Sequence, residues 1–252
     1  MPQNSTLYAF LAPLFIVLCS FTSPVNAEAI SAAEIIKRAD RVRFPDDGFQ
    51  VDVAVQSLYP DREPEVFRYR VLSKSNEDTV VMTTYPASER GRIMLMKGSD
   101  LWVFLPTVSQ PVRLPLSQRL TGQVANGDLA RANFAGDYTA EVIGTEDIAG
   151  AEHYVLDLLA AKPGVTYHRV KYWVNKENYH PHKAEFYTKS GRLLKLSYYD
   201  KYEELGGMIR PVRMRLVDNV KEGEESYMHY KDMVKRNLPD KIFTKSYLKK
   251  LN

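Results

Sequence analysis

The chain has 252 residues, of which 44% are hydrophobic and 11% aromatic, as expected of a globular protein rich in β-structure. Its net charge is +3, and its basic residues are interspersed with acidic ones, so it lacks the clustered basic footprint of nucleic-acid-binding proteins. We expect a single β-rich domain with no nucleic-acid partner.

The amino terminus has the pattern of a secretory signal peptide. Residues 7–21 form an apolar run that is short for a membrane span. Small residues at Val25 and Ala27 precede Glu28, as at a cleavage site. We therefore expect a signal peptide over residues 1–27 and a mature domain over residues 28–252. Because residues 1–27 contain no Lys or Arg, an uncleaved membrane anchor is the alternative.

Cys19 is the only cysteine of the chain. Its apolar surroundings resemble those of a lipidated cysteine, but Leu18 stands where a lipoprotein signal has a small residue, so lipidation is left open. Cleavage after Ala27 would remove Cys19. The mature protein would then have neither a disulfide nor a catalytic thiol.

Residues 31–43 are predicted to form a helix. Ser31 can cap its first turn, and Glu34 follows three residues later, as in a capping box. One face of this helix is apolar, with Ile35, Ile36, Ala39 and Val42. We expect this face to cover part of a sheet.

Most of the remaining chain has the pattern of β-strands separated by short turns. Apolar and polar residues alternate over residues 49–56, which predicts a half-buried strand. Further strands are predicted at residues 65–72, 78–85, 92–97, 100–105, 137–145, 152–160, 167–175, 182–188, 192–199, 208–217 and 226–233. This spacing is typical of a sandwich or barrel, and the short connections favour an antiparallel meander. Residues 239–251 form a weakly helical, Lys-rich end.

Two features of residues 85–134 set this stretch apart. In the strand at 100–105, Trp102 and Phe104 lie on one side and Leu101 and Val103 on the other, and a strand that is apolar on both faces is covered on both. Residues 117–134 are then predicted to form a weakly helical, poorly anchored flap, punctuated by glycines. One cover of the strand would be protein, and the other could be a ligand.

The sequence contains no catalytic motif that we can identify. It has neither a phosphate-binding glycine loop nor a G-x-S-x-G elbow. His180 and His182 share one side of an extended segment, but zinc needs further ligands. Adjacent carboxylates occur only in or beside predicted turns, where solvent keeps their pKa values ordinary. We expect a protein that is not an enzyme and has no metal or cofactor.

Residues 85–134 resemble the outer-membrane lipoprotein-sorting proteins of the LolA/LolB-like superfamily. The resemblance rests on Tyr85-Pro86, on residues 91–95 and 97–106, and on residues 117–122 and 126–129. It implies an incomplete antiparallel β-barrel of about eleven strands with a helical lid over a hydrophobic cavity. It also implies a periplasmic carrier of a Gram-negative bacterium, whose cavity accepts acyl chains of a lipoprotein or lipid and moves them towards the outer membrane.

The resemblance further implies two partners, an inner-membrane transporter and an outer-membrane acceptor. One position departs from the family, because the carriers have an arginine directly before the proline that aligns with Pro86, whereas this chain has Tyr85. A tyrosine carries no charge at neutral pH, so a lipoprotein client is not implied as firmly. The alternative is a periplasmic accessory protein of an inner-membrane exporter of lipids or hydrophobic molecules.

We expect the ligand to contact adaptable apolar side chains, because an acyl chain offers buried area and no hydrogen bonds. The expected cavity and lid residues are Met94, Met96, Trp102, Phe104, Leu120 and Leu129. The expected hinge and latch residues of the lid are Tyr85, Gly122 and Gly127.

Overall fold

The computed structural model describes Met1 and residues 30–75, 77–108, 110–131 and 133–248. The expected signal peptide and Cys19 lie outside these residues, apart from Met1. Within the described part of the chain, no helix is long and apolar enough to cross a membrane.

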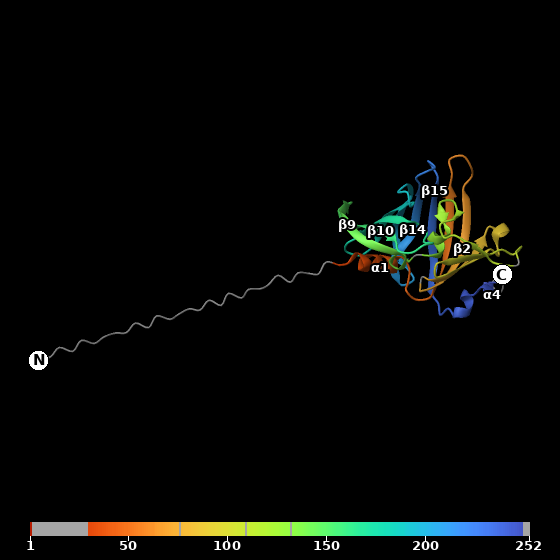
Figure 1. The fold of residues 1–252 in the computed structure, drawn as a ribbon, viewed down its shortest axis with the longest axis horizontal. Helices are drawn as coiled ribbons and strands as arrows, with labels where there is room; N and C mark the ends of the chain where they lie inside the picture. The colour runs from red at the N-terminus through yellow and green to blue at the C-terminus, as the bar shows by residue number, and fades with distance from the viewer. Residues whose placement is uncertain (2–29, 76, 109, 132, 249–252) are drawn as a thin grey trace.

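A thirteen-stranded antiparallel sheet dominates the described residues (Figure 1). Its strands are β1 (Phe49–Leu58), β2 (Glu65–Lys74), β3 (Asp78–Tyr85), β4 (Ile93–Lys97), β5 (Asp100–Phe104), β6 (Val112–Leu114), β9 (Tyr138–Ile148), β10 (Ala151–Ala160), β11 (Arg169–Asn175), β12 (Pro181–Tyr187), β13 (Leu193–Leu205), β14 (Met208–Asp218) and β15 (Glu225–Lys235). Each predicted strand has its counterpart here, and β6 is the addition.

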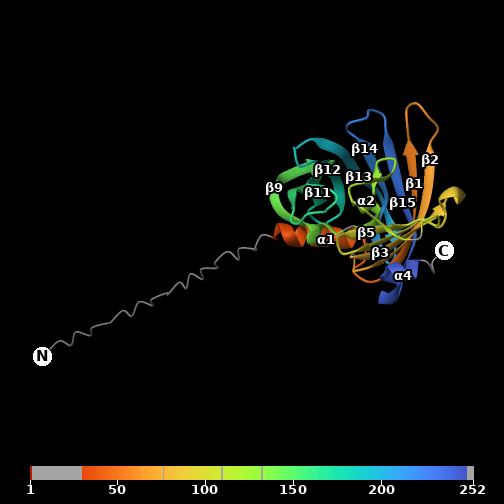
Figure 2. The same cartoon turned by 45° about the vertical axis from the view of Figure 1, so that its right-hand side comes forward.

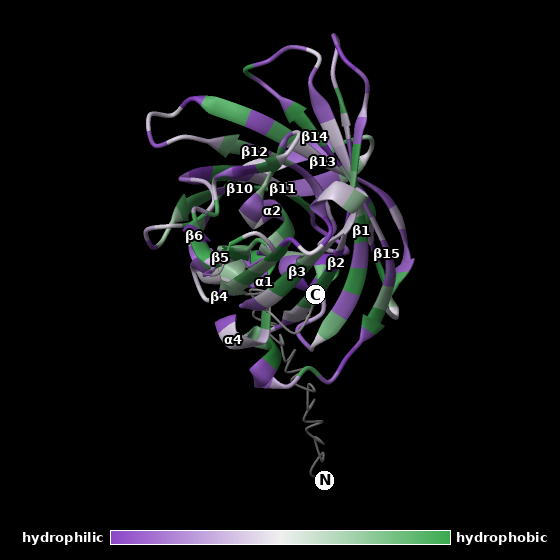
Figure 3. Cartoon of the chain, turned by 90° about the vertical axis from the view of Figure 1, so that its right-hand side faces the viewer, coloured by the Kyte–Doolittle hydropathy of each residue, from purple (hydrophilic) through white to green (hydrophobic). Residues whose placement is uncertain are grey.

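The sheet is a meander that curls without closing. Strands that follow one another in sequence pair, and β1 also pairs with β15, so the order runs from β6 through β1 and β15 to β9. Figure 3 shows the strands curving around a central segment. Because β6 and β9 remain as two edges, the expected incomplete barrel is confirmed, with thirteen strands rather than about eleven.

Helix α1 (Ala32–Arg43) covers part of the concave face and contacts β9 and β14. Ser31 caps it, accepting a hydrogen bond from the Glu34 backbone N–H at 3.2 Å. The Glu34 side chain does not complete a capping box, because it pairs with Arg38 one turn later at 2.8 Å. Ile35 and Ile36 are buried in the main hydrophobic cluster on the concave face, hereafter the inner core, as the apolar face of the helix predicts.

The convex face is apolar where β3, β4 and β5 run side by side. There Val80, Leu95 and Phe104 form a second core, hereafter the outer core, with Phe243 and Leu248. The latter two belong to the carboxyl-terminal helices η2 (Asp240–Phe243) and α4 (Lys245–Leu248), and Figure 3 shows α4 outside the curve of the sheet. The strand at 100–105 is therefore covered on both faces by the protein itself.

Candidate functional site

The segment 117–134, hereafter the lid segment, lies inside the curve of the sheet (Figures 2 and 3). It begins as a small hairpin of β7 (Arg119–Thr121) and β8 (Val124–Ala125) and continues into α2 (Asn126–Ala130). Helix α3 (Phe134–Asp137) starts at its end. The predicted helical character is thus correct only for its second half. The first half is a hairpin because Gly122 adopts a φ of 49° at its turn.

Apolar side chains of the lid segment complete the inner core. Val124, Leu129 and Phe134 are all buried there. The spaces left between the lid segment, α1 and the sheet measure about 10 to 20 Å³ each, which is about the room that one water molecule requires. An acyl chain can therefore reach the concave face only if the lid segment moves.

The two lid glycines are positions of close approach. A Cβ at Gly122 would lie 1.9 Å from the Ser57 hydroxyl and 2.3 Å from the Ser226 hydroxyl, and one at Gly127 would lie 1.9 Å from the Thr166 hydroxyl. Any larger residue would have to push the lid segment away from the sheet. The close docking of the lid segment thus leaves no room for a side chain at these positions, and their expected role as hinges remains a prediction.

Asp128 is the main polar anchor of the lid segment. Its carboxylate accepts hydrogen bonds from the Ala125 backbone N–H at 2.8 Å and from the Tyr167 hydroxyl at 2.8 Å. It also forms an ion pair with Lys195 of β13, whose ammonium donates to the Gln123 carbonyl at 2.7 Å. Burial lowers the pKa of Lys195, and the Asp128 carboxylate opposes this shift. The lid segment is thus better anchored than the sequence predicted.

A second set of polar contacts holds the end of the lid segment. Arg131 forms a buried, two-pronged ion pair with Asp137 and donates to the Gly98 carbonyl at 2.7 Å. The Ala135 backbone N–H donates to the Asp40 carboxylate of α1 at 2.8 Å. These bonds tie the lid segment to the β4–β5 turn and to the first helix.

Asp40 and Arg43 of α1 form an imperfect buried pair at 3.6 Å. Burial raises the pKa of Asp40 to about 7, although Arg43 and backbone donors act in the opposite direction. Asp40 Oδ1 and Arg43 Nη1 have no hydrogen-bond partner. The Arg43 guanidinium instead lies 4.7 Å from the centre of the Phe134 ring. Both charged groups of this pair therefore contact α3, Asp40 through the Ala135 N–H and Arg43 through the Phe134 ring.

The six expected cavity residues fall on two faces of the sheet. Met94, Met96 and Leu129 meet in the inner core, with Leu120 packed against it. Trp102 and Phe104 belong to the outer core. The register explains the division, because Trp102 pairs with Leu95 and therefore lies on the face opposite Met94. A single cavity lined by all six residues is thus incompatible with the fold.

Tyr85 and the histidines His180 and His182, which were considered from the sequence, lie apart from the lid segment. Tyr85 ends β3 with 46% of its surface exposed, and Arg68 lies 5.2 Å from its ring centre. His180 stacks on Tyr202 at 4.3 Å, and His182 contacts His153. Among the described residues, no group of three His, Cys, Asp or Glu side chains is placed to hold a metal ion.

The sequence prediction did not include Asp128, Lys195 or Tyr167, although these residues fix the lid segment. One signal was present. Lys195, Ser197 and Tyr199 share the inner face of β13, so a charged and a polar residue occupy positions that face the core. Such residues require partners when buried, and the sequence alone does not identify the partners.

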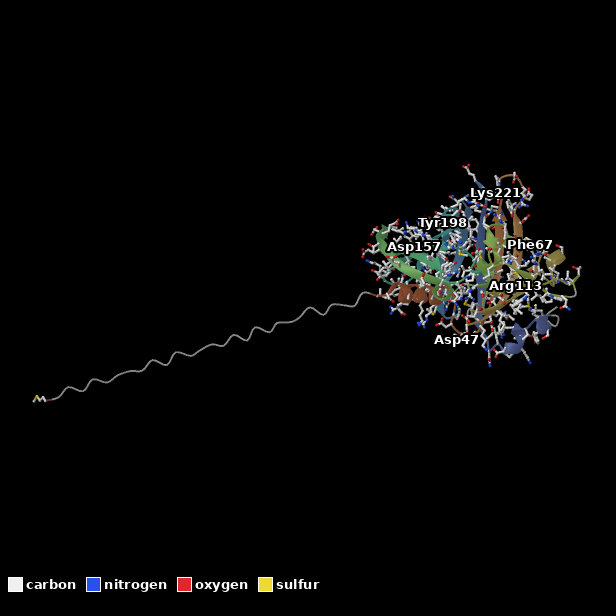
Figure 4. The ribbon with its side chains drawn as sticks, viewed as in Figure 1. Asp47, Phe67, Arg113, Asp157, Tyr198 and Lys221 are labelled. Atoms are coloured by element: carbon white, nitrogen blue, oxygen red, sulfur yellow. The ribbon has the colours of Figure 1, made fainter. Side chains whose placement is uncertain are left out.

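Two larger hollows are open to the surface, and the first of them reaches the lid anchors Tyr167 and Lys195. A polar cleft of about 300 Å³ adjoins the lid hairpin and is lined by Arg119, Arg192, Asp218 and Lys221, among others. Lys221 lies at the end of the sheet opposite Asp47 (Figure 4). A more apolar groove of about 570 Å³ lies along β3 and β4.

Three solved structures have the same architecture. A LolA superfamily protein from Nitrosomonas europaea is 55% identical, with a TM-score of 0.84, and the match covers 87% of this chain and 100% of that one. A DUF1329 family protein from Desulfovibrio piger is 21% identical, with a TM-score of 0.73 and coverages of 86% and 97%. An outer membrane lipoprotein-sorting protein domain from Vibrio parahaemolyticus is 19% identical, with a TM-score of 0.73 and coverages of 86% and 98%. The last two show the fold alone.

A family model described as "Uncharacterized protein" matches residues 75–250. No curated protein sequence is significantly similar to the chain.

Proposed function

Since the chain belongs to the LolA superfamily, we propose that it is a carrier that binds acyl chains of a lipid or lipoprotein on the concave face of its sheet, without catalysing a reaction. One observation carries the proposal. The concave face is apolar, and the lid segment that covers it forms no strand of the large sheet. Side-chain packing and a few polar bonds join the two.

In the proposed binding step, an acyl chain replaces the lid segment on the concave face. The lid segment withdraws Leu129 and Phe134 from the concave face, and an acyl chain takes their place. Each methylene that leaves water contributes about 0.8 kcal/mol, so a long chain can offset the loss of the lid contacts. Met94 and Met96 would line the sheet side of the site, and Leu120 and Leu129 the lid side.

Gly122 and Gly127 are proposed as the two points where the lid segment docks, because each fits a serine or threonine of the sheet side too closely for a side chain. Trp102 and Phe104 are left out of the proposed site, because they face the carboxyl-terminal helices. Tyr85 is solvent-exposed and would act on the lid only after a rearrangement.

The proposed place of action is the periplasm of a Gram-negative bacterium, after removal of residues 1–27. The apolar amino terminus, followed by small residues before Glu28, supports it. The proposed partners are an inner-membrane transporter and an outer-membrane acceptor. The second candidate, an accessory protein of an exporter, is favoured by Tyr85 in place of the carriers' arginine.

Native mass spectrometry of gently purified periplasmic protein tests the proposal. We expect an adduct with the mass of an acyl lipid, which organic extraction removes. Protein that is free of lipid but is captured by an inner-membrane exporter would instead favour the accessory role. Protein that takes up no acyl lipid, even when it is supplied, would contradict the carrier role.

A further inference from the structure

A row of four side chains crosses the convex face in register. Arg70 of β2 pairs with Met82 of β3, Met82 with Ile93 of β4, and Ile93 with Phe104 of β5. Paired residues of neighbouring antiparallel strands lie side by side on the same face. The row therefore places a guanidinium at one end of a continuous apolar strip, on the face opposite the lid segment.

The strip is covered at one end only. Ile93 and Phe104 are buried in the outer core with Leu238 and Phe243 of the carboxyl-terminal segment. Beyond this cover, the partly exposed Met82 forms the apolar floor of an open groove of about 570 Å³, which Pro106 and the edge of the buried Ile93 also line. The groove is thus the uncovered continuation of an apolar surface.

The charged residues that line the groove are Arg70 and Arg90, and no carboxylate lines it. Arg70 already pairs with Asp52 at 2.8 Å. Among the described residues, no carboxylate forms an ion pair with Arg90. The polar cleft differs in containing a carboxylate, because Asp218 lines it and pairs with Arg119. The groove combines an apolar floor, an unpaired guanidinium and a lining without carboxylates.

We propose that this groove binds a second ligand, an amphiphile with one anionic head group and an alkyl chain. Guanidinium groups bind carboxylates and phosphates through paired charge-assisted hydrogen bonds, so the head group, of either kind, would lie at Arg90. The alkyl chain would lie over Met82 and beside Pro106. This site goes beyond the proposed carrier function, because it is on the other face and needs no movement of the lid segment.

Titration of the purified protein with dodecanoate and dodecyl phosphate, followed by methionine-methyl NMR, tests the proposal. We expect shifts of the Met82 methyl signal with at least one probe, and the preferred probe identifies the head group. Dodecyltrimethylammonium should bind weakly because Arg70 and Arg90 repel it. Failure of both anionic probes, or equal binding of the cationic one, would overturn the proposal.

The variant Arg90→Glu sharpens the test, since this exposed side chain has no ion pair to lose. Loss of a charge-assisted contact should weaken binding of the anionic probe about tenfold and should strengthen binding of the cationic one. Arg192→Glu, in the polar cleft, is the matched control and should change neither. If Arg90→Glu binds the anionic probe normally and Met94 shifts in place of Met82, the ligand occupies the concave face. That outcome would overturn this inference and leave the carrier proposal intact.

Discussion

At the scale of single residues, the glycines of the lid segment show how the fold uses the absence of a side chain. Gly122 and Gly98 both adopt positive φ values, 49° and 58°, but a Cβ would have neighbours within 4 Å only at Gly122. Replacing either residue introduces backbone strain. Replacing Gly122 also introduces a collision with Ser57 and Ser226.

We predict that Gly122→Ala lowers the free energy of unfolding by about 1–3 kcal/mol more than Gly98→Ala does, as overpacking of a tight site typically costs. Urea denaturation of both variants measures the difference. Hydrogen exchange within residues 117–134 should also accelerate in Gly122→Ala. Equal losses of stability in the two variants would show that the Ser57–Ser226 contact does not hold the lid segment.

Asp40 gives the protein a predicted pH dependence. Burial raises its pKa in the folded state to about 7, above the ordinary value of 3.8, so the folded state binds the proton more tightly than the unfolded state. The contribution of Asp40 to stability is therefore most favourable at acidic pH and declines as pH rises from about 4 to about 7, by up to about 1.4 kcal/mol per pH unit.

We predict that Asp40→Asn flattens this part of the stability profile, because asparagine keeps an acceptor for the Ala135 N–H and has no proton to release. Thermal melts between pH 4.5 and 8 measure the profile. The exposed Asp46→Asn is the control and should leave its shape unchanged. A wild-type profile that rises steadily from pH 4.5 to 7 would argue against a protonated Asp40.

At the scale of elements, the lid segment and the strand β13 are joined by the Lys195–Asp128 pair, in which both side chains are 7% exposed. We predict that Lys195→Met alone lowers the free energy of unfolding by about 3–5 kcal/mol, because it leaves the buried Asp128 carboxylate without its cationic partner. The double variant Lys195→Met, Asp128→Leu should be less destabilised than this single variant. Chemical denaturation of the wild type and of both variants tests the order, and a double variant less stable than the single one would refute it.

The outer core leads to a prediction for Trp102, whose ring lies 4.0 Å from the Lys245 ammonium of α4. We predict that Trp102→Ala lowers the melting temperature, because α4 loses its packing surface, and leaves acyl binding on the concave face unchanged. Differential scanning fluorimetry and lipid-uptake assays on the same sample separate the two effects. A variant that melts at the wild-type temperature but binds no lipid would contradict this prediction and would show that Trp102 contacts the ligand.

The elements also show where sequence reasoning succeeds. Long strands with strict alternation, such as β1 and β2, were predicted because one face is buried and the other is solvated. The strand β6 was missed because it has three residues between Pro111 and Pro115. The lid hairpin was missed for a similar reason, since strands of two and three residues produce no periodic pattern.

The candidate site was only partly predictable. Period-two patterning shows that each strand has two faces but not which one is concave, and only the observed register places Trp102 and Met94 on opposite faces. The outer cover comes from the carboxyl-terminal helices, far away in sequence, so the sequence left Trp102 free to be assigned to a ligand. The anchors Asp128 and Lys195 are 67 residues apart, and only the fold brings them together.

At the scale of the whole molecule, the chain is one curved sheet with a different cover on each face. The inner cover is the lid segment with α1, held by close glycine contacts and buried ion pairs. The outer cover is the carboxyl-terminal segment, which leaves the groove at Met82 and Pro106 open. The central claim is that acyl chains displace the lid segment from the concave face and bind there.

Photo-crosslinking with a diacylglycerol that carries a photoreactive group in one acyl chain tests this claim most directly, because this lipid has no anionic head to draw it to the outer groove. We predict that mass spectrometry of the digested protein finds the label on the concave side, at or beside Met94, Met96 and Leu129. Label confined to the convex face around Met82 and Ile93, or no label in folded protein, would contradict the account.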